Sequence, residues 1–162
     1  MKKNDKIKNG EAKSPGNGKP SEKAKAPAEK NGIIKEFFPN GKVSAEVPYK
    51  DGVKEGVGKM FYESGKLYAT ETYANGKLNG ATVTEYENGI AQAVLNYKDD
   101  LLDGLCKEYY ASGKPESETT YKAGKKEGVA TVFTEAGAVE KKVTYKNGIA
   151  VATEIPKAPA RA

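Results

Sequence analysis

The sequence predicts an all-β fold: an elongated, single, twisted antiparallel sheet made of five β-hairpin repeats. Three observations predict it. The frame Tyr-x-x-Gly-x-x-x-Gly, as in "YKDGVKEG" at 49–56, returns at a step of 24 residues, a second Gly-containing turn recurs at the same step, and the strand segments alternate apolar and polar residues. Self-similarity at a period of about 20–50 residues indicates a repeat array. A period of two indicates a strand with one buried face.

Composition favours a thin, turn-rich β structure over a helix-packed core. Hydrophobic residues make up 37% of the chain and charged residues 30%, while Trp is absent. The regular spacing of glycine would also interrupt a helix, because glycine is a poor helix former. A single layer of strands that exposes much of each repeat fits this composition.

The N-terminal segment differs in composition from the rest of the chain. Residues 1–31 contain nine Lys against four acidic residues, and Ile7 is their only large aliphatic side chain after Met1. Such a segment cannot bury enough apolar surface to offset its ordering entropy. We therefore expect 1–31 to be a disordered Lys-rich arm that carries the whole net charge of +5. Residues 156–162 are expected to be a flexible tail.

Five repeat units are expected at 32–55, 56–79, 80–103, 104–127 and 128–155. Each is predicted to be a hairpin, with tight Asn-Gly or Ser-Gly turns between its strands. The glycines mark backbone that needs positive φ or a close strand approach, with Asp100 replacing one of them. The tyrosines are expected to cover the apolar face, stacked from one unit to the next. These structural repeat positions are Gly41, Tyr49, Gly52, Gly56, Gly65, Tyr73, Gly76, Gly80, Gly89, Tyr97, Gly104, Gly113, Tyr121, Gly124, Gly128, Gly137, Tyr145 and Gly148.

The segment "YKDGVKEGVGKMFYESGKLYATETYANGKLNG" at 49–80 resembles MORN repeats, in the variant form common in bacteria. The resemblance extends over about 32–155. It implies an interaction or scaffold module, because similar repeats are mostly regarded as such. Some are linked to phospholipid binding, and some bacterial variant-repeat proteins carry an antitoxin-type label.

The residue inventory argues against an enzyme. The chain has no His, which removes the usual general base and the commonest metal ligand. The only cysteine, Cys106, has no His or Arg near it in sequence that would lower its pKa. Asp99, Asp100 and Asp103 fall in a predicted turn, which explains them better than a calcium site does. We therefore expect a non-catalytic protein with no catalytic residue, metal or cofactor.

A protein partner is the leading expectation for function. The aromatic series Phe38, Tyr62, Tyr86 and Tyr110, together with Tyr68 and Tyr109, which break the pattern of their columns, offers candidate contact residues. Tyr68 and Tyr109 are expected to be exposed, because exposed Tyr on a rigid sheet is a common recognition surface. The candidate partner-binding residues are Tyr62, Tyr68, Tyr86, Tyr109 and Tyr110.

Two alternatives stay open beside the protein-binding module. One is a membrane-surface adaptor that makes weak contact with anionic lipid through the arm and the repeat lysines. The other is an antitoxin or immunity-type partner of a toxin. Specific nucleic-acid binding is not expected, because the arm lysines are dilute and no aromatic residue lies among them. Oligomerisation through the first or last strand is a further expectation, because an open sheet has two edges.

The N-terminus predicts a cytoplasmic protein. "MKKNDKIKNGEAKS" has the charges of a signal peptide but no apolar region. No stretch approaches the ~20 apolar residues that span a bilayer. A single cysteine cannot form an internal disulfide, which fits a reducing compartment. An exported form from which a signal has been removed stays open.

Overall fold

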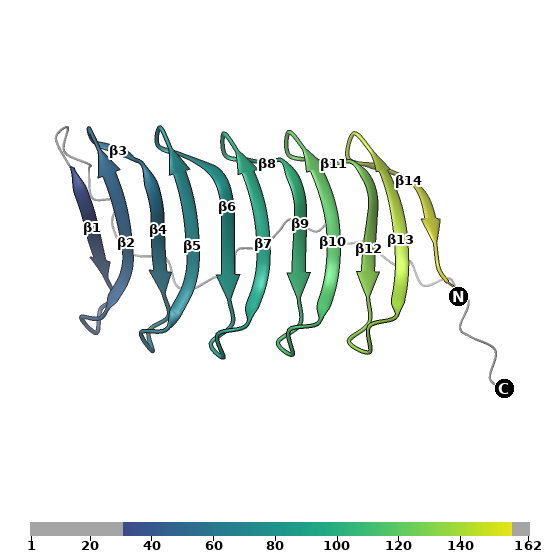
Figure 1. Cartoon of the computed structure of the whole chain (residues 1–162), viewed down its shortest axis with the longest axis horizontal. Coiled ribbons are helices and arrows are strands. Elements are labelled where there is room, and N and C mark those ends of the chain that lie inside the picture. The colour runs from purple at the N-terminus through teal and green to yellow at the C-terminus, as the bar shows by residue number, and fades with distance from the viewer. Residues whose placement is uncertain (1–30, 157–162) are drawn as a thin grey trace, which may run out of the picture.

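A computed structural model describes residues 31–156 (Figure 1). Over this range 14 strands belong to one open antiparallel sheet, and no helix is present. The predicted all-β fold is therefore confirmed. The predicted arm at 1–31 and the tail at 156–162 lie outside the described residues, apart from Asn31 and Pro156.

Most strands follow one another along the sheet in chain order, each antiparallel to the next (Figure 1). These strands are β1 (Gly32–Phe37), β2 (Val43–Lys50), β4 (Gly56–Phe61), β5 (Leu67–Ala74), β6 (Lys77–Glu85), β7 (Ala91–Lys98), β9 (Gly104–Tyr109), β10 (Pro115–Lys122), β12 (Gly128–Phe133), β13 (Val139–Lys146) and β14 (Ile149–Glu154). Three short strands extend the pairing at one edge: β3 (Val53–Lys54) pairs with β2, β8 (Leu101–Leu102) with β7, and β11 (Lys125–Lys126) with β10.

One long edge of the sheet consists of the hairpin loops at 38–42, 62–66, 86–90, 110–114 and 134–138, and we call it the loop edge. In the first loop Gly41 N donates to Phe38 O at 2.9 Å, and Phe38 N donates to Lys42 O at 2.8 Å. Gly41 has φ +81°, so the loop has three residues with glycine in the left-handed position before a bulge. The sequence predicted tight turns here. The bulge lengthens them by one residue.

The opposite long edge, which we call the turn edge, consists of two-residue turns at 51–52, 75–76, 99–100, 123–124 and 147–148. In the first turn Lys50 pairs with Val53, and the two residues between them, Asp51 and Gly52, have φ of 50° and 79°. Two consecutive positive φ angles in a two-residue hairpin define a type I′ turn, whose twist matches that of the flanking strands. The first half of the repeated frame is therefore a strand end followed by this turn.

The core lies on one face of the sheet, which we call the tyrosine face because Tyr49, Tyr73, Tyr97, Tyr121 and Tyr145 lie on it. Residues that pair directly across strands share a face, and the pairing places every buried residue with this tyrosine row. The buried residues are Ala45, Val47, Ala69, Tyr73, Thr82, Ala93, Cys106 and Ala130. The described chain is a single layer, so small side chains and one tyrosine form its core.

The burial of Tyr73 depends on the glycine beneath its ring. A Cβ placed on Gly58 would lie 3.2 Å from Tyr73 Cε2, so the ring rests on bare backbone. Tyr73 is 7% exposed, whereas the other four tyrosines of the row are half-buried. The position of Gly58 is filled by Thr82 and Cys106 in the next two units, so their neighbouring tyrosines cannot approach the backbone as closely.

Candidate interaction surfaces

At the loop edge, tyrosine hydroxyls link the second, third and fourth hairpins each to the next. Each of these hydroxyls donates to a backbone carbonyl 23 residues further along. The bonds are Tyr62 to Glu85 O at 2.5 Å, Tyr86 to Tyr109 O at 2.8 Å and Tyr110 to Phe133 O at 2.7 Å. Burial raises the pKa of all three phenols. The second aromatic series therefore holds neighbouring units together, and its hydroxyls are occupied.

The candidate partner-binding tyrosines are all half-buried. Tyr68 packs edge-on against Tyr62, with ring centroids 5.0 Å apart and an interplanar angle of 70°. The exposure expected for Tyr68 and Tyr109 is therefore only partial: both are half-buried, and the Tyr62 ring covers part of Tyr68. Their role in binding a partner stays a prediction.

Lysines of the loop edge form a second set of links that the sequence analysis missed. Each ammonium group donates to a backbone carbonyl 21 residues further along: Lys42 to Glu63 O at 2.9 Å, Lys66 to Glu87 O at 2.6 Å and Lys114 to Glu135 O at 2.9 Å. The signal in the sequence is the dipeptide Gly-Lys at 41–42, 65–66 and 113–114. Ile90 and Ala138 occupy the remaining two positions.

At the turn edge, a polar side chain of one unit accepts the first turn N–H of the next. The acceptor lies 20 residues before the donor: Asn31 for Asp51 N at 2.8 Å, Glu55 for Asn75 N at 2.7 Å, Asp103 for Ala123 N at 2.9 Å and Glu127 for Asn147 N at 2.8 Å. These residues stand directly before the glycines of the frame. Their carboxylates and amides therefore position the following turn.

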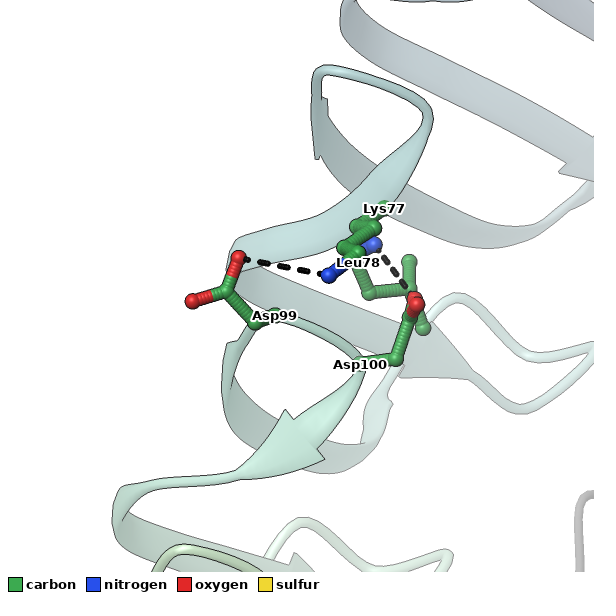
Figure 2. A network of polar contacts seen from close by, with 4 residues as sticks. All are labelled: Lys77, Leu78, Asp99 and Asp100. Atoms are coloured by element: carbon green, nitrogen blue, oxygen red, sulfur yellow. Dashed lines mark hydrogen bonds and ion pairs between the residues drawn. The ribbon is translucent and has the colours of Figure 1, made fainter.

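The remaining step along the turn edge has the opposite direction (Figure 2). Here the carboxylate comes from the later unit: Asp100 Oδ1 accepts from Leu78 N at 2.8 Å. Lys77 Nζ lies 3.9 Å from Asp99 Oδ1 across the same contact. Asp100 has φ +67° at the position where the other units have glycine. Aspartate tolerates this left-handed backbone better than most residues. Its carboxylate makes the hydrogen bond that joins these two units.

Replacing Asp100 with alanine is expected to lower the free energy of unfolding by about 1–2 kcal/mol. Alanine is strained at this positive φ, and the hydrogen bond to Leu78 N is lost. Asp100→Asn keeps an acceptor and a residue that tolerates the backbone, so a change within about 0.5 kcal/mol is expected. Urea unfolding of the two variants measures the difference. Equal losses in both would show that charge, rather than the hydrogen bond, is what matters.

The tyrosine face carries a charged cluster around its most buried ring. The Tyr73 hydroxyl donates to the Glu71 carboxylate, and Lys54 Nζ lies 4.7 Å from the ring centroid. Burial, together with the Glu71 carboxylate, holds the pKa of Tyr73 well above its usual value. Lys126 Nζ lies in the same way 5.1 Å from the Tyr145 ring. The cation and carboxylate here hold the aromatic row in position.

The thiol and phenol near the middle of the tyrosine face are kept neutral. Burial raises the pKa of Cys106, which disfavours the thiolate that a nucleophile requires. Burial also raises the pKa of Tyr121 to about 12, with the Cys106 side chain as a secondary cause.

The raised pKa of Tyr121 predicts a loss of stability at alkaline pH. Up to about pH 10 the phenol is neutral in both states; from about pH 10 to pH 12 the unfolded chain releases its proton first. The free energy of unfolding should therefore fall as pH rises through this window. Urea unfolding at about pH 9 and pH 11 should give a smaller fall for Tyr121→Phe than for the parent chain. An identical fall would contradict the shift.

The other side of the sheet, which we call the opposite face, exposes a regular apolar row. Ile33, Val57, Leu105 and Val129 stand at the same position of their units and are 42–63% exposed. Beside this row, Lys35 Nζ lies 2.9 Å from Glu46 Oε1, and the equivalent pair is Lys107 and Glu118 at 2.8 Å. By strand alternation Tyr109 belongs to this face too, whereas Tyr68 stands at the bulge of β5, skipped between Leu67 and Ala69 in the pairing with β4.

Comparison with known families identifies the repeat. The model of the MORN repeat variant matches residues 30–51, 54–75, 102–123 and 126–147, which together make up more than half of the chain. MORN repeats are generally associated with protein or membrane-lipid binding. A search of curated proteins finds no match. Within the described region no helix is long and apolar enough to cross a membrane.

The matched segments coincide with the hairpins of the sheet. Each match runs through a first strand, a three-residue loop and a second strand, and the matches lie in one phase at steps of 24 or 48 residues. The unmatched interval contains β6 and β7, where the turn-edge link is reversed. The chain belongs to the MORN repeat variant family.

Proposed function

We propose that this chain is a non-catalytic interaction module that binds a protein partner on the opposite face of its sheet. The observation that carries the proposal is the exposed row formed by Ile33, Val57, Leu105 and Val129. Successive members lie two strands apart, roughly 9.6 Å at the usual strand spacing, except that Ala81 interrupts the row. An elongated partner can therefore make the same apolar contact at several units.

The half-buried tyrosines extend this proposed surface toward the loop edge. Tyr109 lies on the same face as the row, Tyr68 stands at the bulge of β5 against the Tyr62 ring, and Tyr86 and Tyr110 anchor the loops beside them. Aromatic side chains held rigid by packing lose little entropy on binding and are frequent in interface hot spots. The proposed contact therefore joins the apolar row to Tyr109, and Tyr68 stays a candidate at the loop edge.

Two features support the non-catalytic part of the proposal. The sequence contains no His, and burial keeps the Cys106 thiol protonated. We also propose that 78–99 is a fifth, diverged repeat of the family. Its support is the register Gly80 with Tyr97, which matches Gly56 with Tyr73 in the preceding hairpin.

The test is affinity capture from the native lysate with the full-length chain, followed by mass spectrometry. We expect one protein to be retained at high salt in near-stoichiometric amount. Val57→Lys and Leu105→Lys place a charge in the apolar row and should abolish its retention. The matched control is Ser112→Lys, which adds the same charge at an exposed loop-edge position. Retention of the partner by all three variants would overturn the proposed surface. Turnover of a substrate by the purified chain would overturn the proposal that the chain is non-catalytic.

An adaptor for anionic membranes is the second candidate. Its support is a row of exposed lysines at one turn-edge position, Lys50, Lys98, Lys122 and Lys146, to which the N-terminal lysines of the sequence add charge. It predicts co-sedimentation of the full chain with phosphatidylserine vesicles that is lost as salt is raised. Binding that is unaffected by Lys122→Glu and Lys146→Glu would reject it.

An antitoxin-type role in a bacterium is a special case of the protein-binding proposal. It is carried by family resemblance alone, and the test above separates it from a scaffold role. A toxin captured through the apolar row, and inhibited by the full chain, would support it.

A further inference from the structure

The last strand of the described chain, β14, is an open edge with the composition of an interface. It pairs with β13 on one side and ends the order of strands on the other. All six of its residues are exposed, including Ile149 at 69% and Val151 at 59%, and Ile155 beyond it is 73% exposed. An edge strand presents unpaired backbone N–H and C=O groups that can bind another strand.

The repeat geometry shows what β14 lacks. It follows β13 through a type I′ turn at Asn147 and Gly148, as β4, β6, β9 and β12 follow the second strands before them. Each of those four first strands is bound on its outer side by the second strand of its own hairpin. In the described chain β14 has no such second strand, so its outer side is open.

The two edges of the sheet differ in how they are protected. The first strand, β1, contains Lys35 and Glu36, and charged residues discourage edge-to-edge pairing; the register shift in its pairing with β2 falls on Ser44 of β2. In β14 the pairing with β13 skips Val151, but no charged residue occurs from Ile149 to Thr153. Charge therefore protects the N-terminal edge and leaves the C-terminal edge without such protection.

We propose that β14 pairs with β14 of a second copy of this chain, antiparallel and about a two-fold axis perpendicular to the sheet. The sheet is antiparallel throughout, and this operation continues it with the tyrosine faces on the same side. Because Ile149–Thr153 is uncharged, pairing the strand with itself brings no like charges together. The proposal is independent of the partner assigned to the opposite face.

Head-to-tail assembly is disfavoured by strand direction. β1 and β14 run the same way (Figure 1), so joining one copy's β14 to another copy's β1 requires a parallel pair in an antiparallel sheet. Head-to-tail contacts also repeat without closing and give filaments, whereas a two-fold contact closes at the dimer. A pair of six-residue strands buries less than the ~1,200–2,000 Å² of a stable interface, so a weak, concentration-dependent dimer is expected.

Sedimentation velocity of the full chain over a range of concentrations tests the proposal. We expect a monomer–dimer equilibrium that Val151→Lys weakens at least about tenfold, because two lysines then face each other across the axis. The matched control is Ile33→Lys, a similar change at a similarly exposed aliphatic residue on the β1 edge, which should leave the dimer unchanged. A monomer at every concentration, or a dimer broken by Ile33→Lys and not by Val151→Lys, overturns the proposal.

Cysteine cross-linking tests the two-fold axis itself. Cys106→Ala removes the native thiol, and alanine is tolerated at this position because Ala130 fills it, buried, in the next unit. Single cysteines are then placed at Ala150, Val151, Ala152 and Thr153. A two-fold pair brings one position of the strand opposite its own copy, within the Cα distance that a disulfide spans. Rapid cross-linking at one or two alternating positions is expected; equal rates at all four, or higher oligomers, would overturn the two-fold pairing.

Discussion

Replacing Tyr73 with alanine is expected to lower the free energy of unfolding by about 3–5 kcal/mol, the usual cost of removing a buried aromatic side chain. Tyr73 is the only large side chain among the buried residues of the described core. Its ring rests on Gly58, and Lys54 Nζ lies over it. Truncation leaves a cavity that the surrounding alanines cannot fill, and it strips the Glu71 carboxylate of its donor.

Urea unfolding of the full chain measures this loss. Tyr145→Ala is the matched control, because Tyr145 has the same place in its unit and a lysine over its ring but is only half-buried. The control should lose about half as much free energy or less, since the transferred area is smaller. If both variants lose the same amount, burial does not set the contribution of the tyrosine row.

Replacing Gly80 with alanine is expected to cost about 2–4 kcal/mol. Two independent effects add at this residue. Its φ of +123° lies outside the range that side-chain-bearing residues adopt without strain. A Cβ would also lie 3.0 Å from Thr72 Cγ2 and 3.1 Å from Thr72 Cβ, so the neighbouring strand must shift.

The control for Gly80 separates backbone strain from crowding. Gly128 stands at the same position of its unit, has φ +78°, and has no atom within 4 Å of an added Cβ. Gly128→Ala should therefore show only the cost of a left-handed alanine, about 1 kcal/mol. Equal destabilisation of both variants, measured by urea unfolding, would mean that crowding against Thr72 contributes nothing.

The equivalent positions of successive repeats could be predicted from the sequence, because a fixed period of 24 residues gives each residue the same position in its hairpin as its counterpart in the next unit. Tyr73 and Gly80 were identified as structural positions from that period. The alternation in Val43–Lys50 correctly placed Ala45 and Val47 on the buried tyrosine face. The sequence predicted tight turns at the loop edge without their length, because Asn40-Gly41 suits both a two-residue turn and a three-residue loop, and the observed bulge decides between them.

The links between units could not be predicted, because a period does not say which atoms reach across strands. The Tyr86 hydroxyl and the Asp103 carboxylate bind backbone groups 23 and 20 residues away, and backbone acceptors leave no pattern in the sequence. Tyr68 was expected to be exposed for the same reason: the period does not show that its ring packs against Tyr62. β14 was missed because Ala152 replaces the glycine that marks the other first strands.

The constant spacing of the links has a consequence for how the length of this protein can change. The side-chain links described along the two long edges span 20 to 23 residues, and each joins adjacent units only. Excising 104–127 as a block would leave Asp103 positioned to accept from Asn147 N, and the Tyr86 hydroxyl positioned to donate to Phe133 O. Loss of this block therefore preserves both of these links at the new joint, so gene rearrangement can change the length of the array without redesigning them.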